Sequence, residues 1–316
     1  MNRDQIMDSL GRIDDEVIQK VNTARAHRKH KVNIGRWISL AACLILIVSA
    51  ALTAEAENGT VSNLLAPLFG GAQTEIVEEI GVPIGASTTV NGYTLTVDAI
   101  IGDRYSVMIA YTLSRDDGQP IPENIRFRDI EIRASGYMTR IEIDEDDPSI
   151  AHFHERWHRN EPLLGHIVTP SFSTLVLDNG ENEDTLVAEG TWELTFALRY
   201  PDTSETLPVQ DMVVYDESGR KYQVKRIILS RVGIHMDVIE YDPVFAEVSF
   251  AGFNTALLLK DGTVVPLEGG GGGGGMREGD ETRKFSYYGE FDIPVPREDI
   301  AGIIICGTLY HLPPTE

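Results

Sequence analysis

One stretch of the chain, from Trp37 to Ala54, is predominantly apolar and contains no charged residue. At the rise of an α-helix its 18 residues extend about 27 Å, close to the roughly 30 Å of a bilayer's hydrocarbon core. Five Lys or Arg residues lie between positions 25 and 36, and the next basic residue after the run is Arg104. The positive-inside rule therefore predicts one transmembrane helix over 37–54, with residues 1–36 in the cytoplasm and the rest of the chain outside.

Three other interpretations of this run fit its flanks less well. A signal peptide cleaved at Ala54-Glu55-Ala56 would carry 36 residues before its apolar part, far more than usual. A lipoprotein signal at Leu40–Cys43 would place the cysteine near the start of the apolar run instead of at its end. A buried core helix would leave the basic cluster before the run, and the lack of basic residues after it, without a reason.

Apolar residues in the tail recur at helical spacing. Ile6, Leu10, Ile13, Val17 and Val21 follow one another at intervals of three or four residues, which places them on one face of a predicted helix. Such a face can lie on anionic membrane lipid beside the basic cluster. It can equally bind the groove of a cytoplasmic partner protein, and the spacing leaves both alternatives open.

Beyond residue 80 the pattern changes to that of β-strands. Thr88–Ala99 contains an Asn-Gly turn signal followed by alternating apolar residues, and Ile125–Ile143 alternates apolar with charged residues as a half-exposed antiparallel sheet does. Further strands are predicted over Tyr105–Leu113, Thr191–Tyr200, Asp211–Tyr215, Tyr222–Leu229, Gly233–Tyr241, Ala246–Phe250, Ala256–Leu259 and Ile300–Tyr310. Many short strands without a long helical pattern predict a mainly β fold with two β-sandwich domains of the immunoglobulin-like kind.

These patterns divide the chain into five predicted parts. They are a cytoplasmic helical tail (1–36), a transmembrane helix (37–54), a connector (55–80) and two extracytoplasmic β-domains (81–203 and 204–316). The connector includes a short helical turn over Thr74–Gly81, and Pro201–Pro208 reads as the linker between the two β-domains.

Charge and cysteine content narrow the candidate functions. The net charge is −22, yet residues 1–37 hold eight Lys or Arg against five Asp or Glu, a local balance of +3 that leaves −25 for the rest. An acidic region of this size repels phosphates, so we do not expect it to bind nucleic acid. The two cysteines, Cys43 in the apolar run and Cys306 in a predicted strand, do not form a disulfide framework, so folding must depend on apolar cores.

One segment matches a metal-site motif. His154-Glu155-Arg156-Trp157-His158 has the H-E-x-x-H pattern, in which two His one helical turn apart hold zinc and the Glu activates water. Pro148 and Pro162 confine any helix here to about three turns, and the downstream residues of the extended zincin pattern are absent. We therefore expect a short polar helix inserted between strands, with no metal ligand, catalytic residue or cofactor.

Two low-complexity stretches resemble binding loops only superficially. The acidic run Asp144–Asp147 lacks the glycine and distal glutamate of a calcium loop, so a solvated loop is expected. Gly269–Gly275 lacks the spacing and the Lys-Ser/Thr of a phosphate-binding loop, so it is expected to be a flexible connection between strands.

Several segments, taken in order, resemble a bacterial family. IDDEVIQKV (Ile13–Val21), RWISLAACLILIV (Arg36–Val48) and TTVNGYTLTVDAIIGDRYSVMIAYTL (Thr88–Leu113) are similar to the DUF4179 family of Gram-positive membrane proteins, which are described as anti-sigma-factor-like. EGTWELTFAL (Glu189–Leu198) and YQVKRIILSRVGIHMDV (Tyr222–Val238) resemble the DUF5643-type β-domain that commonly follows.

The resemblance implies a transmembrane regulator. The sequence has no nucleophile elbow, Walker motif or dinucleotide fingerprint, so we expect no enzymatic activity. The regulator's tail would hold an extracytoplasmic-function sigma factor through Ile6, Leu10, Ile13, Val17 and Val21, since 36 residues are too few for a helical bundle. The outer β-domains would sense or bind an envelope signal. The alternatives are a surface-anchored binding or structural module with no role in transcription, and a membrane-tethered metalloprotease.

Overall fold

The computed structural model describes residues 60–69, 74–131, 134–178, 184–210, 212–243, 252–273 and 281–313. The predicted tail, the predicted transmembrane run and the predicted strand Ala246–Phe250 lie outside these residues. None of the helices within the described ranges has the length and apolar character needed to cross a bilayer.

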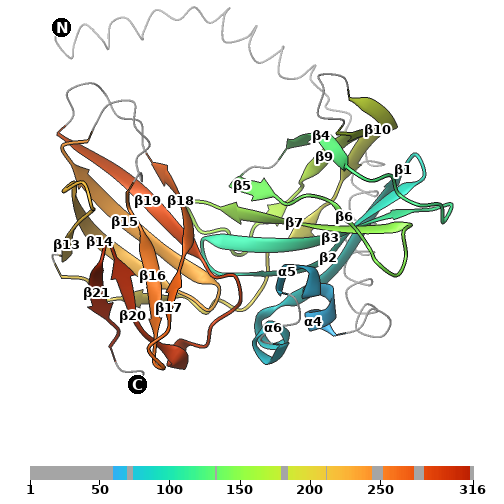
Figure 1. The fold of residues 1–316 in the computed structure, drawn as a ribbon. Helices are drawn as coiled ribbons and strands as arrows, with labels where there is room; N and C mark the ends of the chain where they lie inside the picture. The colour runs from blue at the N-terminus through green and yellow to red at the C-terminus, as the bar shows by residue number, and fades with distance from the viewer. Residues whose placement is uncertain are drawn as a thin grey trace, which may run out of the picture. The chain divides into compact units, whose positions relative to one another are not determined.

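The described residues are mainly β-strand, which confirms the fold class at that level (Figure 1). The described helices are α4 (Val61–Leu64), α5 (Ala66–Phe69), α6 (Thr74–Ile80) and the 3-10 helix η1 (Arg297–Asp299). The described strands are β1 (Val82–Val90), β2 (Tyr93–Gly102), β3 (Ser106–Arg115), β4 (Ile125–Glu131), β5 (Ser135–Met138), β6 (Glu142–Ile143), β7 (Ile150–His158), β8 (Ile167–Val168), β9 (Ser171–Leu177), β10 (Thr185–Glu193), β11 (Phe196–Ala197), β12 (Glu205–Leu207), β13 (Met212–Tyr215), β14 (Lys221–Leu229), β15 (Gly233–Tyr241), β16 (Thr255–Leu259), β17 (Val264–Pro266), β18 (Glu268–Gly273), β19 (Thr282–Glu290), β20 (Ile300–Ile305) and β21 (Thr308–His311).

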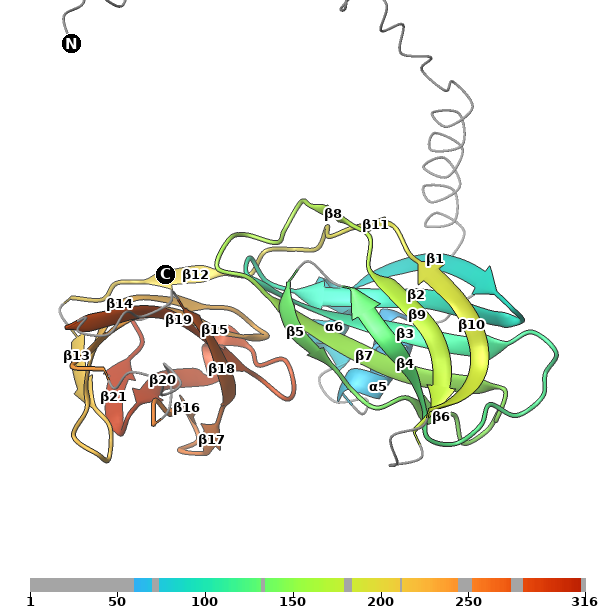
Figure 2. The same ribbon diagram turned by 90° about the horizontal axis from the view of Figure 1, so that it is seen from above.

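Residues 82–200, called here the first β-region, form two main antiparallel sheets. Sheet A has the strand order β1-β2-β3-β7-β5, with β6 also paired to β7, and sheet B has the order β10-β9-β4. Figure 2 shows β4, β9 and β10 as a layer over the strands of sheet A. Apolar side chains of both sheets share one core, in which Leu95 and Phe153 of sheet A meet Phe172 and Trp192 of sheet B. The two sheets therefore pack face to face, because each has one apolar face to bury.

The hairpin between β1 and β2 forms where the sequence predicts it. Asn91 and Gly92 occupy the turn with φ of 48° and 79°, the left-handed conformations that a two-residue hairpin loop requires. Val90 pairs with Tyr93 directly across this turn, and the pairing continues to Val82 and Ile100.

The end of the predicted connector is folded against sheet A. Helices α4, α5 and α6 bury Leu65, Phe69, Val77 and Ile80 in a separate apolar cluster. That cluster includes Ala99, Ile101, Met108 and Ala110 of β2 and β3, on the face of sheet A turned away from the main core. The predicted helical turn at Thr74 is confirmed by α6. Helices α4, α5 and α6 thus cover an apolar face that the sheet would otherwise expose.

Residues 205–312, called here the second β-region, repeat this arrangement of two sheets around one core. Sheet D has the order β12-β14-β15-β19-β18, with β13 also paired to β14, and sheet E has the order β17-β16-β20-β21. Its core includes Tyr222 and Phe285 of sheet D together with Leu257 and Ile303 of sheet E. β12 lies within the stretch predicted to be a plain linker.

Two sequence predictions in the second β-region are wrong. Residues 269–273, expected to be part of a flexible loop, belong to β18 and pair with β19 over the register Glu268–Glu290 to Gly273–Phe285. Cys306, expected inside a strand, lies in the turn between β20 and β21 with a φ of 47°. Backbone pairing alone stabilises β18 at its glycine positions, because glycine has no side chain to pack.

Candidate functional site

Strand β7 presents different chemistry on its two faces, because successive side chains of a strand point to opposite sides. Ala151, Phe153, Glu155 and Trp157 are buried on the side of the main core of the first β-region. The alternate positions, which face the other way, are His152, His154, Arg156 and His158.

This alternation replaces the helix that the sequence predicts for the H-E-x-x-H segment, so that prediction is wrong. Four residues along a strand span about 13 Å, so His154 and His158 cannot ligate one zinc ion, whose bonds to nitrogen are about 2 Å long. Glu155 points to the opposite face of the strand. Within the described residues, no group of three or more His, Cys, Asp or Glu side chains is placed to hold a metal ion.

Glu155 is a buried acid in an apolar core, with 1% of its surface exposed. Its Oε2 atom accepts a hydrogen bond from the Tyr111 hydroxyl at 2.7 Å and another from the Trp157 indole Nε1 at 3.2 Å. Burial raises the pKa of Glu155 to about 7, although both hydrogen bonds favour the charged form. The carboxyl therefore positions the indole and changes charge near neutral pH.

Glu290 of β19 joins the second β-region to the outer face of β7. Its Oε2 atom accepts a hydrogen bond from Arg156 Nη1 at 2.7 Å and one from the Tyr137 hydroxyl at 3.2 Å. His158 Nδ1 lies 3.3 Å from the Glu290 Oε1 atom, close enough for ion pairing but without hydrogen-bond alignment. Burial lowers the pKa of His158, and the Glu290 carboxylate opposes that shift. We call this group of four side chains the junction.

A row of rings continues the junction. His158 stacks on Tyr288 with ring centroids 5.0 Å apart, Tyr288 meets His235 edge-on at 4.8 Å, and His235 contacts Tyr105 at 4.4 Å. The Tyr288 hydroxyl also donates to the side-chain oxygen of Asn160. Rings at these spacings bury apolar area, and among the described residues the buried Nδ1 atoms of His158 and His235 have no hydrogen-bond partner.

Asp103 forms a second polar link between the two β-regions. Its Oδ1 atom accepts the backbone N–H groups of Tyr105 and Ser106, both at 2.8 Å, and its Oδ2 atom accepts the Ser230 hydroxyl at 2.7 Å. Only 5% of the Asp103 surface is exposed. A buried carboxylate with three donors is well compensated, so this link orders the turn that follows β2.

The turn between β14 and β15 reaches from the second β-region to the connector helices. Val232 belongs to the apolar cluster that contains Leu65 and Ile80, and the Arg231 guanidinium pairs with the Glu79 carboxylate of α6. The connector helices therefore contact sheet A and the second β-region at once.

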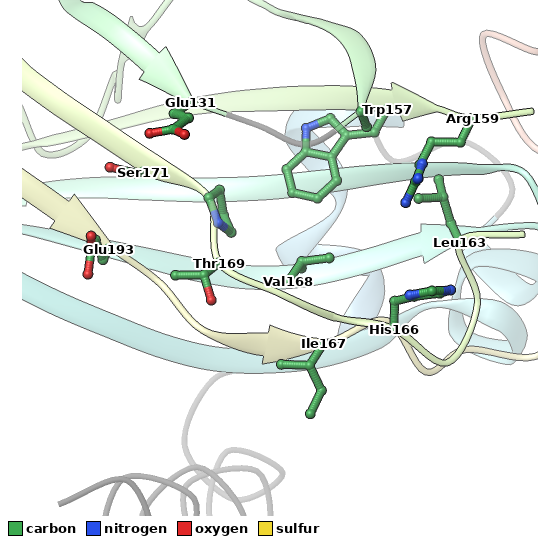
Figure 3. A pocket seen from close by; sticks show the side chains of 12 residues that line it. Glu131, Trp157, Arg159, Leu163, His166, Ile167, Val168, Thr169, Ser171 and Glu193 are labelled. Atoms are coloured by element: carbon green, nitrogen blue, oxygen red, sulfur yellow. The ribbon is translucent and has the colours of Figure 1, made fainter. Parts of the chain in front are cut away.

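A cavity of about 410 Å³ opens in the first β-region beside the end of β7. Figure 3 shows Trp157 over its middle, with Arg159, Leu163 and His166 toward one end and Glu131, Ser171 and Glu193 toward the other. Its remaining lining residues are Ala134, Ile167, Val168, Thr169 and Pro170. A concave site of this volume, with an apolar middle and a few charged groups, is of the kind that binds small organic ligands.

The acidic run singled out in the sequence forms a turn. Asp144 Oδ1 accepts the backbone N–H groups of Asp146 and Asp147 at 2.9 and 2.8 Å, and Asp147 Oδ1 accepts the Ser149 backbone N–H and hydroxyl. These carboxylates are used as turn acceptors, and their pKa values are lowered by the same hydrogen bonds.

Most residues of the cavity and the junction were not found from the sequence. Arg159, His166 and Glu193 carry no local motif. Glu290 lies at the end of β19, a strand that was not predicted. No local sequence pattern could have identified these residues, because their side chains come together only in the tertiary structure.

Comparisons with known proteins place few constraints on function. No protein-family profile matches the chain, and no curated protein matches it. A search of solved structures returns a conserved domain protein from Bacillus anthracis with 14% sequence identity and a TM-score of 0.47. That match covers 71% of this chain and 76% of the other, and a likeness of this degree does not extend to function.

Proposed function

We propose that this chain is a single-pass membrane regulator of the anti-sigma-factor-like kind. In this proposal residues 37–54 cross the membrane, the tail before them binds an extracytoplasmic-function sigma factor, and two immunoglobulin-like β-sandwiches outside the cell bind an envelope signal. The apolar run, the basic residues before it and the resemblance to DUF4179 proteins support the topology. The two sheets around each core support the sandwich assignment.

The observation that carries the sensing role is the alternation along β7. Trp157 lines the cavity, while its neighbours Arg156 and His158 point to the opposite side and contact Glu290 of the second β-region. A ligand that displaces the indole moves the backbone of β7, and the junction then changes with it. Strand β7 thus provides a direct physical connection between a binding cavity and the second β-region.

A route from the second β-region toward the membrane follows from the connector. Arg231 and Val232 contact helices that begin only a few residues after the proposed transmembrane segment. The second β-region, which contributes Glu290 to the junction, therefore also contacts α6. Coupling of this kind requires that a ligand bind the two arrangements with different affinity.

The tail is tested by its effect on transcription and by direct capture. Ile13→Glu places a charge on the apolar face of the proposed helix, and Gln19→Glu places the same residue on the opposite face as a matched control. Ile13→Glu should release sigma-dependent transcription and lose capture of the sigma factor by the full-length protein, whereas Gln19→Glu should do neither. If transcription and sigma-factor capture are the same in both variants and the parent, the proposed regulatory role is wrong.

That last outcome favours the second candidate, a surface-anchored binding module. The cavity beside Trp157 supports such a module whether or not the tail has a partner. Normal surface display, unchanged transcription and retained ligand binding in the Ile13→Glu variant would together favour this alternative.

A further inference from the structure

The cavity beside Trp157 has carboxylates at one end. Glu131 of β4 and Glu193 of β10 both pair in register with Ser171 of β9, so the three side chains lie in one row on one face of sheet B. Strands are about 4.8 Å apart, which puts the two carboxyl groups on either side of the serine hydroxyl. Within the described part of the chain, neither carboxylate has an ion-pair partner. A cationic ligand group would find two acceptors here (Figure 3).

The other end of the cavity is basic. Arg159 and His166 line it, and Figure 3 shows both side chains beside Leu163. Arg159 has one carboxylate nearby, Glu161, at 3.6 Å, and the Glu161 side chain is 80% exposed. A loose, solvated pair of this kind contributes little, so a ligand carboxylate that meets the guanidinium squarely can replace it.

Apolar side chains separate the two charged ends. Trp157 and Leu163 are each 2% exposed and turn part of their surface toward the cavity, together with Val168 and Pro170. A purely anionic ligand would meet Glu131 and Glu193 unfavourably, and a purely cationic one would meet Arg159. A neutral apolar ligand would desolvate all of these groups without pairing them.

From this distribution of charge we propose that the cavity binds a short peptide with both termini free. The peptide ammonium lies between Glu131 and Glu193, the peptide carboxylate meets Arg159 and His166, and an apolar side chain packs against Trp157. A cavity of about 410 Å³ suits a di- or tripeptide. The proposal rests on the proposed function in that it names the class of signal that the outer region binds.

Calorimetric titration of the purified full-length chain tests this with three related probes. The probes are the tripeptide Ala-Leu-Ala, its N-acetylated form and its C-terminal amide. The free tripeptide should bind, and each blocked form should bind about tenfold more weakly or worse, because each loses one charge-assisted contact. Equal affinity for all three, or no binding of any, overturns the proposal.

Paired substitutions assign each terminus to its end of the cavity. Arg159→Gln should weaken the free tripeptide about tenfold and leave the C-terminal amide unaffected, while Glu193→Gln should weaken the free tripeptide and leave the N-acetylated form unaffected. Arg128→Gln and Glu123→Gln, which remove one charge of each sign from outside the cavity, are the controls. If either variant weakens the free peptide and both blocked peptides equally, the assignment of the two termini is overturned.

Two further measurements separate this proposal from its rivals. Glycerophosphoethanolamine presents the zwitterion of a lipid headgroup, and tighter binding of that probe than of Ala-Leu-Ala overturns the peptide assignment. Capture of the sigma factor by the tail is measured on the same preparation without any peptide. A failure of peptide binding is therefore distinguished from a failure of sigma-factor capture, because each is measured separately.

Discussion

Arg156 of β7 donates a hydrogen bond to Glu290 of β19 at 2.7 Å, and the two side chains are only 10% and 14% exposed. These residues lie 134 positions apart, so the pair forms only when both β-regions are folded. Removing one partner leaves the other charge largely buried without its counter-charge, which is costly.

Arg156→Met should therefore reduce the free energy of unfolding by about 3 kcal/mol, measured by urea denaturation. Arg104→Met is the matched control, because Arg104 pairs with Asp202 at 2.8 Å but keeps 40% of its side chain exposed and should lose under about 1 kcal/mol. The double variant Arg156→Met, Glu290→Leu should be less destabilised than Arg156→Met alone. Equal losses at the buried and the exposed pair would contradict the burial of the junction.

The buried acid Glu155 makes stability depend on pH in a specific direction. Its pKa is about 7 in the folded state, above the ordinary value of 4.5, so the folded protein holds a proton that the unfolded chain has released. Stability from this group is complete below pH 4.5 and falls, by on the order of 3 kcal/mol in total, as the pH rises to about 7. Asp98, whose pKa burial also raises to about 7, acts in the same direction.

Glu155→Gln should flatten the Glu155 part of that slope. The amide oxygen still accepts the Tyr111 and Trp157 donors, so the variant should match the parent near pH 5 and exceed it above pH 7. Unfolding is followed by tryptophan fluorescence between pH 4.5 and 8. Glu145→Gln, in an exposed loop position, should leave the slope unchanged. A parental slope in Glu155→Gln would show that Glu155 does not change charge in this range.

Two neighbouring glycines of β18 differ in what surrounds them. A Cβ atom at Gly269 would collide with the ring and hydroxyl of Tyr287, which is 2% exposed and held by a 2.7 Å hydrogen bond to Thr255. A Cβ atom at Gly270 would meet nothing within 4 Å. Gly269→Ala should therefore lose about 1 to 3 kcal/mol, and Gly270→Ala should stay within about 0.5 kcal/mol of the parent. Similar losses in thermal unfolding would mean that β18 does not pack on Tyr287.

The glycine run also shows where prediction from the sequence stops. Seven glycines in a row indicate a loop by composition, since nothing local favours a strand. Five of them nevertheless lie in β18, because β19 offers a free edge of backbone donors and acceptors and the Tyr287 ring requires a neighbour without a side chain. That requirement exists only in the tertiary structure.

The segment His154–His158 is a second place where the local sequence pattern predicts the wrong structure. Its residues match a helical metal motif, and its charged and aromatic side chains obscure the alternation of a strand. Glu155 breaks the apolar pattern of the buried face, and it is tolerated there only because Tyr111 and Trp157 donate to it. A local pattern cannot report such compensation, since Tyr111 comes from another strand.

The sequence by itself determined the β-rich character of the chain, the hairpin at Asn91-Gly92 and the strands on either side of Ser230, because alternation and turn chemistry are local properties. Only the tertiary structure decided that Glu131, Glu193 and Arg159 line one cavity and that Arg156 meets Glu290. Glu131, Glu193 and Glu290 lie on three separate strands, while Arg156 lies on β7 and Arg159 directly follows it. No short-range preference of the chain specifies which distant strands will pair or which side chains will share a buried space.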